Sequence, residues 1–284
     1  MKATVPASSA NLGPGFDALG LALGLYISVS VELSDALQVS SSGEGAGLFD
    51  DERHLAVKVA KEVVGHDRLA IHVESEIPLA RGLGSSAALA VAAAAAAGSP
   101  DPLAVAAKID GHPENAAASV LGGLVGATTL GSRVRAARLA LDPDLQFVVF
   151  IPDHELRTED ARSVLPETYS RQDVAFNLGR MALLLGGLGD HRLLTPQAME
   201  DRLHQPYRLA LFPQSQAIMD AAVEAGALGA CWSGAGPSLI AVTLASTTGP
   251  VLAAMQASQE QLSVPGSVRA LEADHVGLQL DSAR

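Results

Sequence analysis

Strand-like and helix-like hydrophobic patterns alternate along the first half of the chain. Residues 21–33 pass from an apolar run into strict alternation of apolar and polar positions, which is typical of a half-buried strand, and residues 69–75 predict a second strand. Helical spacing or alanine-rich composition predicts helices over residues 55–64, 86–97, 102–109 and 114–120. Gly65 and Gly98 follow two of these segments as stop signals.

The second half opens with an apolar, β-branched segment at residues 145–151, which predicts a buried strand between Pro143 and Pro152. Helical patterns dominate residues 158–199 and return at 214–224, and residues 228–244 predict two short strands around a turn. The least structured segment is residues 40–51. We expect two lobes, residues 1–148 and 149–284.

The composition indicates a compact folded protein. Hydrophobic residues make up 48% of the 284 positions and charged residues only 18%, so apolar burial can offset the entropy of ordering the chain. The net charge of -12 argues against a nucleic-acid or anionic-membrane binder, which needs a basic surface. The single cysteine excludes an intramolecular disulfide, and no apolar run matches a signal peptide or a membrane span. A cytoplasmic protein is therefore expected.

A glycine-rich loop separates the strand at 69–75 from the alanine-rich helix. Residues 77–88 read Ile-Pro-Leu-Ala-Arg-Gly-Leu-Gly-Ser-Ser-Ala-Ala. Glycines let the backbone approach a phosphate, and a helix start presents unpaired N–H groups and the positive end of the helix dipole. Arg81 can add charge, and Ser85 or Ser86 can ligate Mg²⁺. The alternative is an ordinary turn with a serine N-cap.

This loop matches neither the Walker nor the Rossmann glycine pattern. It resembles the phosphate loop of the GHMP kinases, Pro-x-x-x-Gly-Leu-Gly-Ser-Ser-Ala, at every fixed position. The resemblance implies that the loop, residues 78–88, binds ATP. The implied nucleotide contacts are Leu79, Ala80, Arg81, Gly82, Leu83, Gly84, Ser85, Ser86, Ala87 and Ala88, with His54 near the adenine where the family commonly has asparagine.

Residues 5–20, Val-Pro-Ala-Ser-Ser-Ala-Asn-Leu-Gly-Pro-Gly-Phe-Asp-Ala-Leu-Gly, are similar to the homoserine kinases within that superfamily. In isolation, Asn11 and Asp17 are common turn formers in a glycine-rich connector. The resemblance implies that Asp17 meets the ammonium group of the substrate and that Asn11 is a neutral donor and acceptor beside it.

Residues 110–116, Asp-Gly-His-Pro-Glu-Asn-Ala, resemble the family segment Glu-Gly-His-Pro-Asp-Asn with two departures. Asp110 stands where the family has the glutamate assigned to Mg²⁺, so the resemblance implies a metal site of Ser86 and Asp110. Glu114 replaces the usual aspartate. His112 and Asn115 match positions that line the substrate pocket, and Ser86, Asp110 and Asn115 are the implied catalytic residues. A surface turn before a helix is the alternative.

Two arginines suit an amino-acid substrate, because a guanidinium can hold an α-carboxylate with two parallel hydrogen bonds. Arg162, with Thr158 before it, lies in a segment similar to the family's Ser/Thr-x-x-x-Arg-x-x-Leu-Pro. Arg208 lies in Gln-Pro-Tyr-Arg, similar to Glu-Pro-x-Arg. Alternatively, both arginines are solvated charges on helix faces and Thr158 is an N-cap.

Residues 229–238 resemble the third glycine-rich motif of the superfamily, which closes against the phosphate loop. The resemblance as a whole implies a two-lobed α+β fold, with an N-terminal lobe like ribosomal protein S5 domain 2 and a C-terminal ferredoxin-like lobe. It implies transfer of the ATP γ-phosphoryl group to the hydroxyl of L-homoserine with Mg²⁺, in threonine biosynthesis. Family members are often homodimers. The alternatives are a mevalonate-type kinase and a non-catalytic nucleotide-binding regulator.

Overall fold

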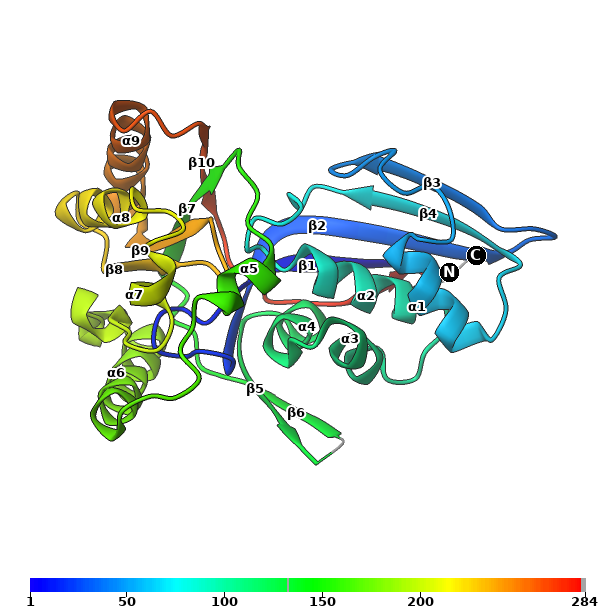
Figure 1. Ribbon diagram of the computed structural model, residues 1–284, viewed down its shortest axis with the longest axis horizontal. Coiled ribbons are helices and arrows are strands. Elements are labelled where there is room, and N and C mark those ends of the chain that lie inside the picture. The colour runs from blue at the N-terminus through cyan, green and yellow to red at the C-terminus, as the bar shows by residue number, and fades with distance from the viewer. Residues whose placement is uncertain (132, 282–284) are drawn as a thin grey trace.

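Two β-sheets, one at each end of an elongated molecule, organise the chain (Figure 1). The computed structural model describes residues 1–131 and 133–281. Lys2, the second residue, and Asp281, the last described residue, both lie in the larger sheet, so the chain leaves this lobe, builds the second one and returns.

The larger sheet has the order β11-β1-β2-β4-β3, and β5 continues it beside the start of β2. Its strands are β1 (Lys2–Ala10), β2 (Leu19–Leu33), β3 (Gln38–Gly43), β4 (Leu69–Ser75), β5 (Leu124–Leu130), β6 (Arg133–Arg138) and β11 (Gln279–Asp281). Only the β3–β4 pair is parallel among the pairings of the described strands in this sheet.

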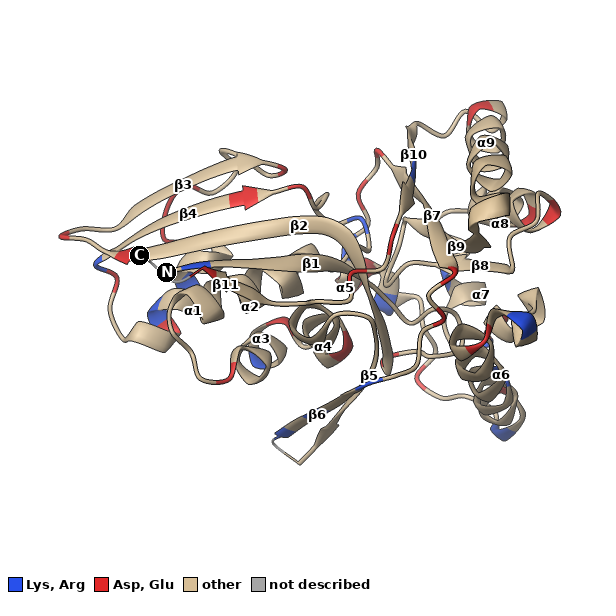
Figure 2. Cartoon of the chain, turned by 180° about the vertical axis from the view of Figure 1, so that it is seen from behind, with Lys and Arg blue, Asp and Glu red and all other residues tan. Residues whose placement is uncertain are grey.

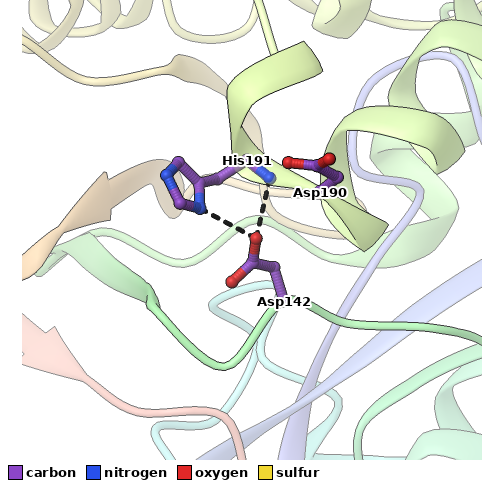
Figure 3. Close-up of side chains that lie close together, drawn as sticks. All are labelled: Asp142, Asp190 and His191. Atoms are coloured by element: carbon purple, nitrogen blue, oxygen red, sulfur yellow. Dashed lines mark hydrogen bonds and ion pairs between the residues drawn. The ribbon is translucent and has the colours of Figure 1, made fainter.

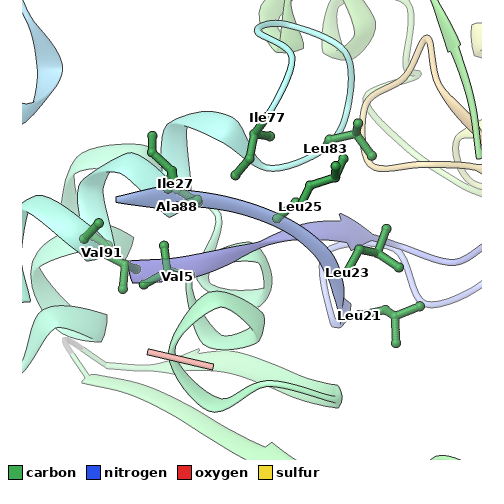
Figure 4. Close-up of a cluster of buried hydrophobic side chains, with 14 of the residues drawn as sticks. Val5, Leu21, Leu23, Leu25, Ile27, Ile77, Leu83, Ala88 and Val91 are labelled. Carbon is green, nitrogen blue, oxygen red and sulfur yellow. The ribbon is translucent and has the colours of Figure 1, made fainter. Parts of the chain in front are cut away.

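Four helices cover one face of this sheet: α1 (Leu55–Val64), α2 (Ser85–Ala96), α3 (Pro102–Asp110) and α4 (Pro113–Leu121). Helix α2 lies against β1 and β2 and also contacts the other three helices. It is buried all round, so it needs no polar face, and its alanines let the neighbouring elements approach closely. Figure 4 shows Val5 of β1, Ile27 of β2 and Val91 of α2 in this core.

The second lobe is a four-stranded antiparallel sheet of order β10-β7-β9-β8. Its strands are β7 (Leu145–Pro152), β8 (Gly229–Trp232), β9 (Leu239–Leu244) and β10 (Gly266–Leu271). Its helical segments are α5 (Thr158–Ser163), α6 (Arg171–Gly189), η1 (His191–Leu193), η2 (Pro196–Met199), α7 (Gln205–Arg208), α8 (Ser215–Glu224) and α9 (Ala245–Gln261). Helices follow β7 and β9, which is the β-α-β-β-α-β succession of a ferredoxin-like lobe.

The predicted strands and helices of the first half, and the strand before the second-half helices, are confirmed to within a few residues. The predicted division between residues 148 and 149 is wrong, because it cuts through β7. Residues 279–281 also do not belong to the second lobe: β11 pairs with β1, with Lys2 opposite Asp281, and covers the edge of the first sheet.

The sequence pattern missed β1, β3, the β5–β6 hairpin, α9 and the last two strands. Strand β1 carries Ser8 and Ser9 just before its last residue, Ala10, and both serines are fully buried although polar, so its sequence lacks the apolar alternation of β2. Strand β3, residues 38–43, overlaps the start of the segment that was expected to be least structured, residues 40–51. Helix α9 has Pro250 inside it and little segregation of apolar residues.

We predict that Gly82→Ala destabilises the protein more than Gly65→Ala. Both glycines have positive φ, +73° and +86°, so both alanines carry the strain of a left-handed backbone, about 1–2 kcal/mol. A Cβ at Gly82 would also collide with the Ser233 carbonyl oxygen, whereas a Cβ at Gly65 would meet open space. Urea unfolding of the two variants measures the difference. Equal losses of stability would contradict the close packing of Gly82.

Candidate active site

The lobes meet at a cavity of about 510 Å³ that collects residues from distant parts of the chain. Its lining residues are Ala10, Asn11, Asp17, Ala80, Arg81, Gly82, Leu83, Gly84, Ser85, Ser86, Ala87, Asp110, His112, Glu114, Asn115, Arg157, Thr158, Glu159, Arg162, Arg208, Gly234 and Ala235. Most of the residues that the sequence singled out therefore lie around one space. Figure 2 shows that acidic and basic residues are scattered along the ribbon of both lobes.

The helix start at the cavity is open to an anion. The N-cap of α2 is Gly84, with φ of +67° and no side-chain cap, so the serine N-cap alternative is wrong. Ser86 is exposed at the first turn, and the first N–H groups of the helix have no intrahelical partners. A helix start with free N–H groups and a hydroxyl binds phosphate groups well.

Both lobes hold the phosphate loop. The Ser8 amide of β1 donates to the Leu83 carbonyl at 3.1 Å, and the Ser233 hydroxyl donates to the Gly82 carbonyl at 2.7 Å. These bonds fix the loop between the first sheet and the turn at residues 233–238. The loop is therefore shaped before any ligand arrives.

Arg81, which the sequence offered as additional charge for a phosphate, lines the cavity but directs its hydrogen bonds to protein groups. Its guanidinium donates to the carbonyls of Leu79, Pro152 and Asp153 and forms an ion pair with Glu155 at 3.4 Å. All three guanidinium nitrogens have protein partners. Arg81 thus ties the loop to the second lobe at the end of β7.

Three of the expected nucleotide contacts, His54, Leu79 and Ala88, do not line the cavity. The Nδ1 atom of His54 accepts the Ala56 amide at 3.1 Å and caps α1, and burial lowers the pKa of this ring. Ala88 is buried in the core beneath α2.

Asp17 and Arg162, which were expected to bind opposite ends of a substrate, form an ion pair with each other. Arg162 Nη2 lies 2.7 Å from Asp17 Oδ1, and Nη1 lies 3.2 Å from Oδ2. The geometry is the bidentate one that favours a carboxylate. Each of these groups therefore keeps its charge satisfied at the cavity wall.

Asn11 serves the protein rather than facing the cavity freely. Its Nδ2 donates to the Gly234 carbonyl at 2.8 Å, and its Oδ1 accepts the Asp17 amide at 3.0 Å. Both Asn11 and Asp17 have positive φ, 71° and 53°, a conformation that asparagine and aspartate tolerate better than most residues. Asn11 thus orients Asp17 and joins its loop to the second lobe.

Arg208 is buried at 1% exposure without a carboxylate partner among the described residues. Its Nε donates to the Ala161 carbonyl, and its Nη1 donates to the Gly234 carbonyl at 2.9 Å and to His204 Nδ1 at 3.0 Å. Burial lowers its pKa to about 10, so the guanidinium stays charged at neutral pH. A buried cation held by neutral acceptors favours an anionic ligand.

Three further predicted residues lie at the corner between α3 and α4. Asp110 Oδ2 is 3.1 Å from His112 Nδ1, and this hydrogen bond raises the pKa of His112. Asn115 Oδ1 accepts the Ser8 hydroxyl at 2.9 Å, and its Nδ2 donates to Glu114 Oε1 at 3.3 Å. Burial of Glu114, which is 2% exposed, raises its pKa to about 7.

Helix α5 begins at Thr158, with Arg157 at the N-cap position and no side-chain cap. The N-cap interpretation of Thr158 is therefore wrong, and its side chain lines the cavity with Arg157 and Glu159.

Sequence reasoning did not select His204 and Phe16, whose rings stack on each other next to Arg208. His204 directly precedes the Gln-Pro-Tyr-Arg segment that was recognised, and its adjacency to that segment was the available signal.

A second group of titratable side chains lies outside the cavity. Asp142, Asp190 and His191 each place one possible metal-ligand atom within 4.8 Å of the other two (Figure 3). Among the described residues, no other group of three histidine, cysteine or acidic side chains comes this close together. Asp142 Oδ2 accepts both the amide and Nδ1 of His191 at 2.8 Å, and Asp190 pairs with Arg192 at 2.6 Å. These bonds fasten η1 to the segment before β7.

Comparison with known proteins agrees with this geometry. Residues 53–123 match the family model of the GHMP kinase N-terminal domain, and residues 180–260 match that of the GHMP kinase C-terminal domain. A homoserine kinase from Caldicellulosiruptor bescii is 42% identical over 254 residues, 84% of this chain and 82% of that protein. Another, from Microchaete diplosiphon, is 40% identical over 96% of this chain and 95% of its own length. The chain belongs to the homoserine kinase family.

Solved structures show the same relationship. The crystal structure of homoserine kinase from Cytophaga hutchinsonii superimposes with a TM-score of 0.85 at 27% identity, covering 98% of this chain and 96% of that one. The mevalonate kinase of L. major, solved with R-mevalonate, has a TM-score of 0.67 at 17% identity and covers 99% of this chain and 96% of that one. At that identity it shows a shared fold alone. The expected two-lobed GHMP kinase fold is confirmed.

We predict that Glu114→Gln raises the stability of the protein at pH 8 but not at pH 4.5. An unfolded Glu114 ionises near pH 4.5, whereas the folded one keeps its proton until about pH 7. Wild-type stability therefore falls as pH rises between these values, by at most about 3 kcal/mol, and glutamine escapes this loss. Urea unfolding at both pH values measures it. The exposed Glu260→Gln is the control, and a pH-independent difference for Glu114→Gln would contradict the assignment.

Proposed function

We propose that the cavity binds ATP and L-homoserine side by side and transfers the γ-phosphoryl group to the side-chain hydroxyl, giving O-phospho-L-homoserine and ADP. The observation that carries this proposal is the junction of an open helix start at Ser86 with a pair of arginines and a carboxylate. The helix start suits the phosphates of ATP. The charged groups suit the two charges of an amino acid.

Homoserine binds by replacing the ion pair between Asp17 and Arg162 with two ion pairs of its own. The α-ammonium group of homoserine binds the Asp17 carboxylate. The α-carboxylate binds Arg162 and the Nη2 atom of Arg208. Because the substrate carries one charge of each sign, it replaces both halves of the Asp17–Arg162 pair without leaving either one unpaired. Asn11 keeps Asp17 in place during the exchange.

The residues at the phosphate end fit a magnesium ion. Ser86 and Asp110 both line the cavity, and their hydroxyl and carboxylate oxygens are ligands that Mg²⁺ accepts together with phosphate oxygens and water. When bound, the ion neutralises negative charge that develops on the transferred group. Aspartate at 110 preserves the carboxylate of the family's glutamate in a shorter form.

Positioning supplies most of the remaining catalysis, because phosphoryl transfer passes through a loose transition state that does not need a strong base. Asn115 is held by Ser8 on one side and Glu114 on the other and lines the cavity, and the second hydrogen of its amide is available to the substrate hydroxyl oxygen. The hydroxyl proton passes to the phosphoryl group. The start of α2 stabilises the charge on that group.

A mevalonate-type kinase is a weaker candidate, since its substrate has no ammonium group to meet Asp17. A non-catalytic regulator would have no need for the intact phosphate loop. We also propose a cytoplasmic homodimer, for which the exposed Val174 and Leu178 on α6 offer apolar surface. Within the described residues, no helix combines the length and the apolar character needed to cross a bilayer.

A coupled ADP-release assay with Mg²⁺-ATP tests the function. We expect turnover with L-homoserine, and none above background with mevalonate, L-threonine or no acceptor. Turnover on mevalonate would replace the proposed substrate. Binding of ATP without turnover on any acceptor would favour the regulator and direct attention to Asp110.

Arg208→Lys should raise the KM for homoserine about 10- to 100-fold and leave the KM for ATP unchanged. A lysine offers a point charge in place of the fork that holds a carboxylate, and hydrogen bonds to charged groups contribute about 1.5–3 kcal/mol. Steady-state kinetics with each substrate varied in turn measures both constants. Arg180→Lys, which alters a surface pair with Glu200, is the control. An unchanged homoserine KM in Arg208→Lys would refute the carboxylate assignment.

A further inference from the structure

His204 lies between the loop that carries Asp17 and the Arg208 side chain, yet it does not line the cavity. The side chain is 0% exposed and precedes α7, the helix that carries Arg208. Its Nε2 lies 2.8 Å from the Gly13 carbonyl oxygen, and its Nδ1 lies 3.0 Å from Arg208 Nη1. One ring thus connects the N-terminal loop of the first lobe to an arginine of the second.

The two contacts define the tautomer of the ring. A carbonyl oxygen only accepts, so Nε2 carries the hydrogen; a guanidinium only donates, so Nδ1 is the acceptor. A second proton would set an N–H against the N–H of Arg208 and add a positive charge beside it. Burial lowers the pKa of His204 to about 4, and nearby Asp201, at 3.6 Å from Nε2, does not outweigh burial. The neutral ring fits both partners at once.

Phe16 extends the same connection to Asp17. Its ring stacks on His204 with centroids 5.0 Å apart and planes inclined by 21°. The Arg162 and Arg208 guanidinium carbons lie 5.8 Å and 5.7 Å from the Phe16 centroid. Phe16 is therefore close to both arginines, and the next residue along the chain is Asp17.

We propose that His204 is a positioning residue that sets the spacing between Arg208 and the Asp17 loop, and so adapts the cavity to the ammonium and carboxylate of one α-amino acid. This inference rests on the proposed function. The Nε and Nη1 atoms of Arg208 are taken by Ala161, Gly234 and His204, while no bond from Nη2 is found among the described residues. Holding Nη1 turns Nη2 toward the ligand and removes the cost of ordering the side chain on binding.

Two substitutions, each of which replaces one ring nitrogen of His204, test its two contacts separately. In His204→Asn the amide oxygen replaces the Nδ1 acceptor for Arg208, whereas in His204→Gln the amide nitrogen replaces the Nε2 donor to Gly13 and the acceptor for Arg208 is lost. We expect the KM for homoserine to rise about tenfold or more in His204→Gln, which loses the contact with Arg208, and by a smaller factor in His204→Asn, which holds Arg208 but loses the bond to Gly13. The KM for ATP and kcat should stay near wild type in both.

A substrate analogue without a carboxylate shows whether the weaker binding in His204→Gln arises at the carboxylate of homoserine. 3-Amino-1-propanol keeps the ammonium and hydroxyl groups of homoserine but lacks the carboxylate, so His204→Gln should leave its inhibition constant against homoserine within twofold of wild type. His191→Gln alters a histidine whose Nδ1 also meets a partner but which lies outside the cavity, and it should change neither constant.

The outcomes distinguish this inference from the proposed function. If wild-type protein does not phosphorylate homoserine, the proposed function fails and takes the inference with it. If wild type is active but both His204 variants change kcat and the two KM values in parallel, or if His204→Gln leaves the homoserine KM unchanged, only the positioning role is refuted. If the variants do not fold, nitrogen NMR of wild-type protein with labelled histidine tests the inference instead. We expect a neutral His204 ring with its hydrogen on Nε2. A hydrogen on Nδ1, or a protonated ring at pH 6, would overturn the inference.

Discussion

The Ser233 hydroxyl occupies the point at which the two lobes and the phosphate loop meet. It donates to the Gly82 carbonyl at 2.7 Å and lies 2.8 Å from the Ser9 hydroxyl of β1, while Asn11 donates to the neighbouring Gly234 carbonyl. A Cβ on Gly82 would collide with the Ser233 backbone carbonyl oxygen beside this contact. The relative position of the lobes, and with it the whole cavity, therefore depends on a few bonds between small residues.

The charged groups at the cavity wall differ in how they are balanced. Asp17 and Arg162 neutralise each other in the structure, and Arg208 is held by carbonyl and imidazole acceptors that carry no charge. Binding an amino acid that carries both charges keeps this balance, whereas an acceptor without an ammonium group would leave Asp17 unpaired. Specificity in such a site follows from the cost of an unpaired charge as much as from the attraction between the paired groups.

The residues that we propose to carry chemistry and those that hold the cavity wall in place come from different kinds of segment. Ser86, Asp110 and Arg162 lie at the ends of helices, where side chains reach the cavity. Ser8, Asn11 and His204 are buried, and they bond to other residues that line the cavity: the Asn115 side chain, the Asp17 amide and the Arg208 guanidinium, respectively. Substitutions in the second set should act through geometry rather than by removing a reacting group.

By itself, the sequence determined the elements with strong local signals: the alternation of β2, the alanine-rich α2, and the glycine loop between β4 and α2. Its motifs also identified Asp17, Arg162 and Arg208 and the family to which they belong. Only the tertiary structure decided that Asp17 and Arg162 pair, that Arg81 is a tether, that His54 caps a helix, and that β11 returns to the first sheet. These outcomes depend on partners 70 or more residues away for the ion pair, the tether and the strand, and no local pattern records such contacts. His204 was missed for the same reason, because its function lies in joining Gly13 to Arg208 across the lobes.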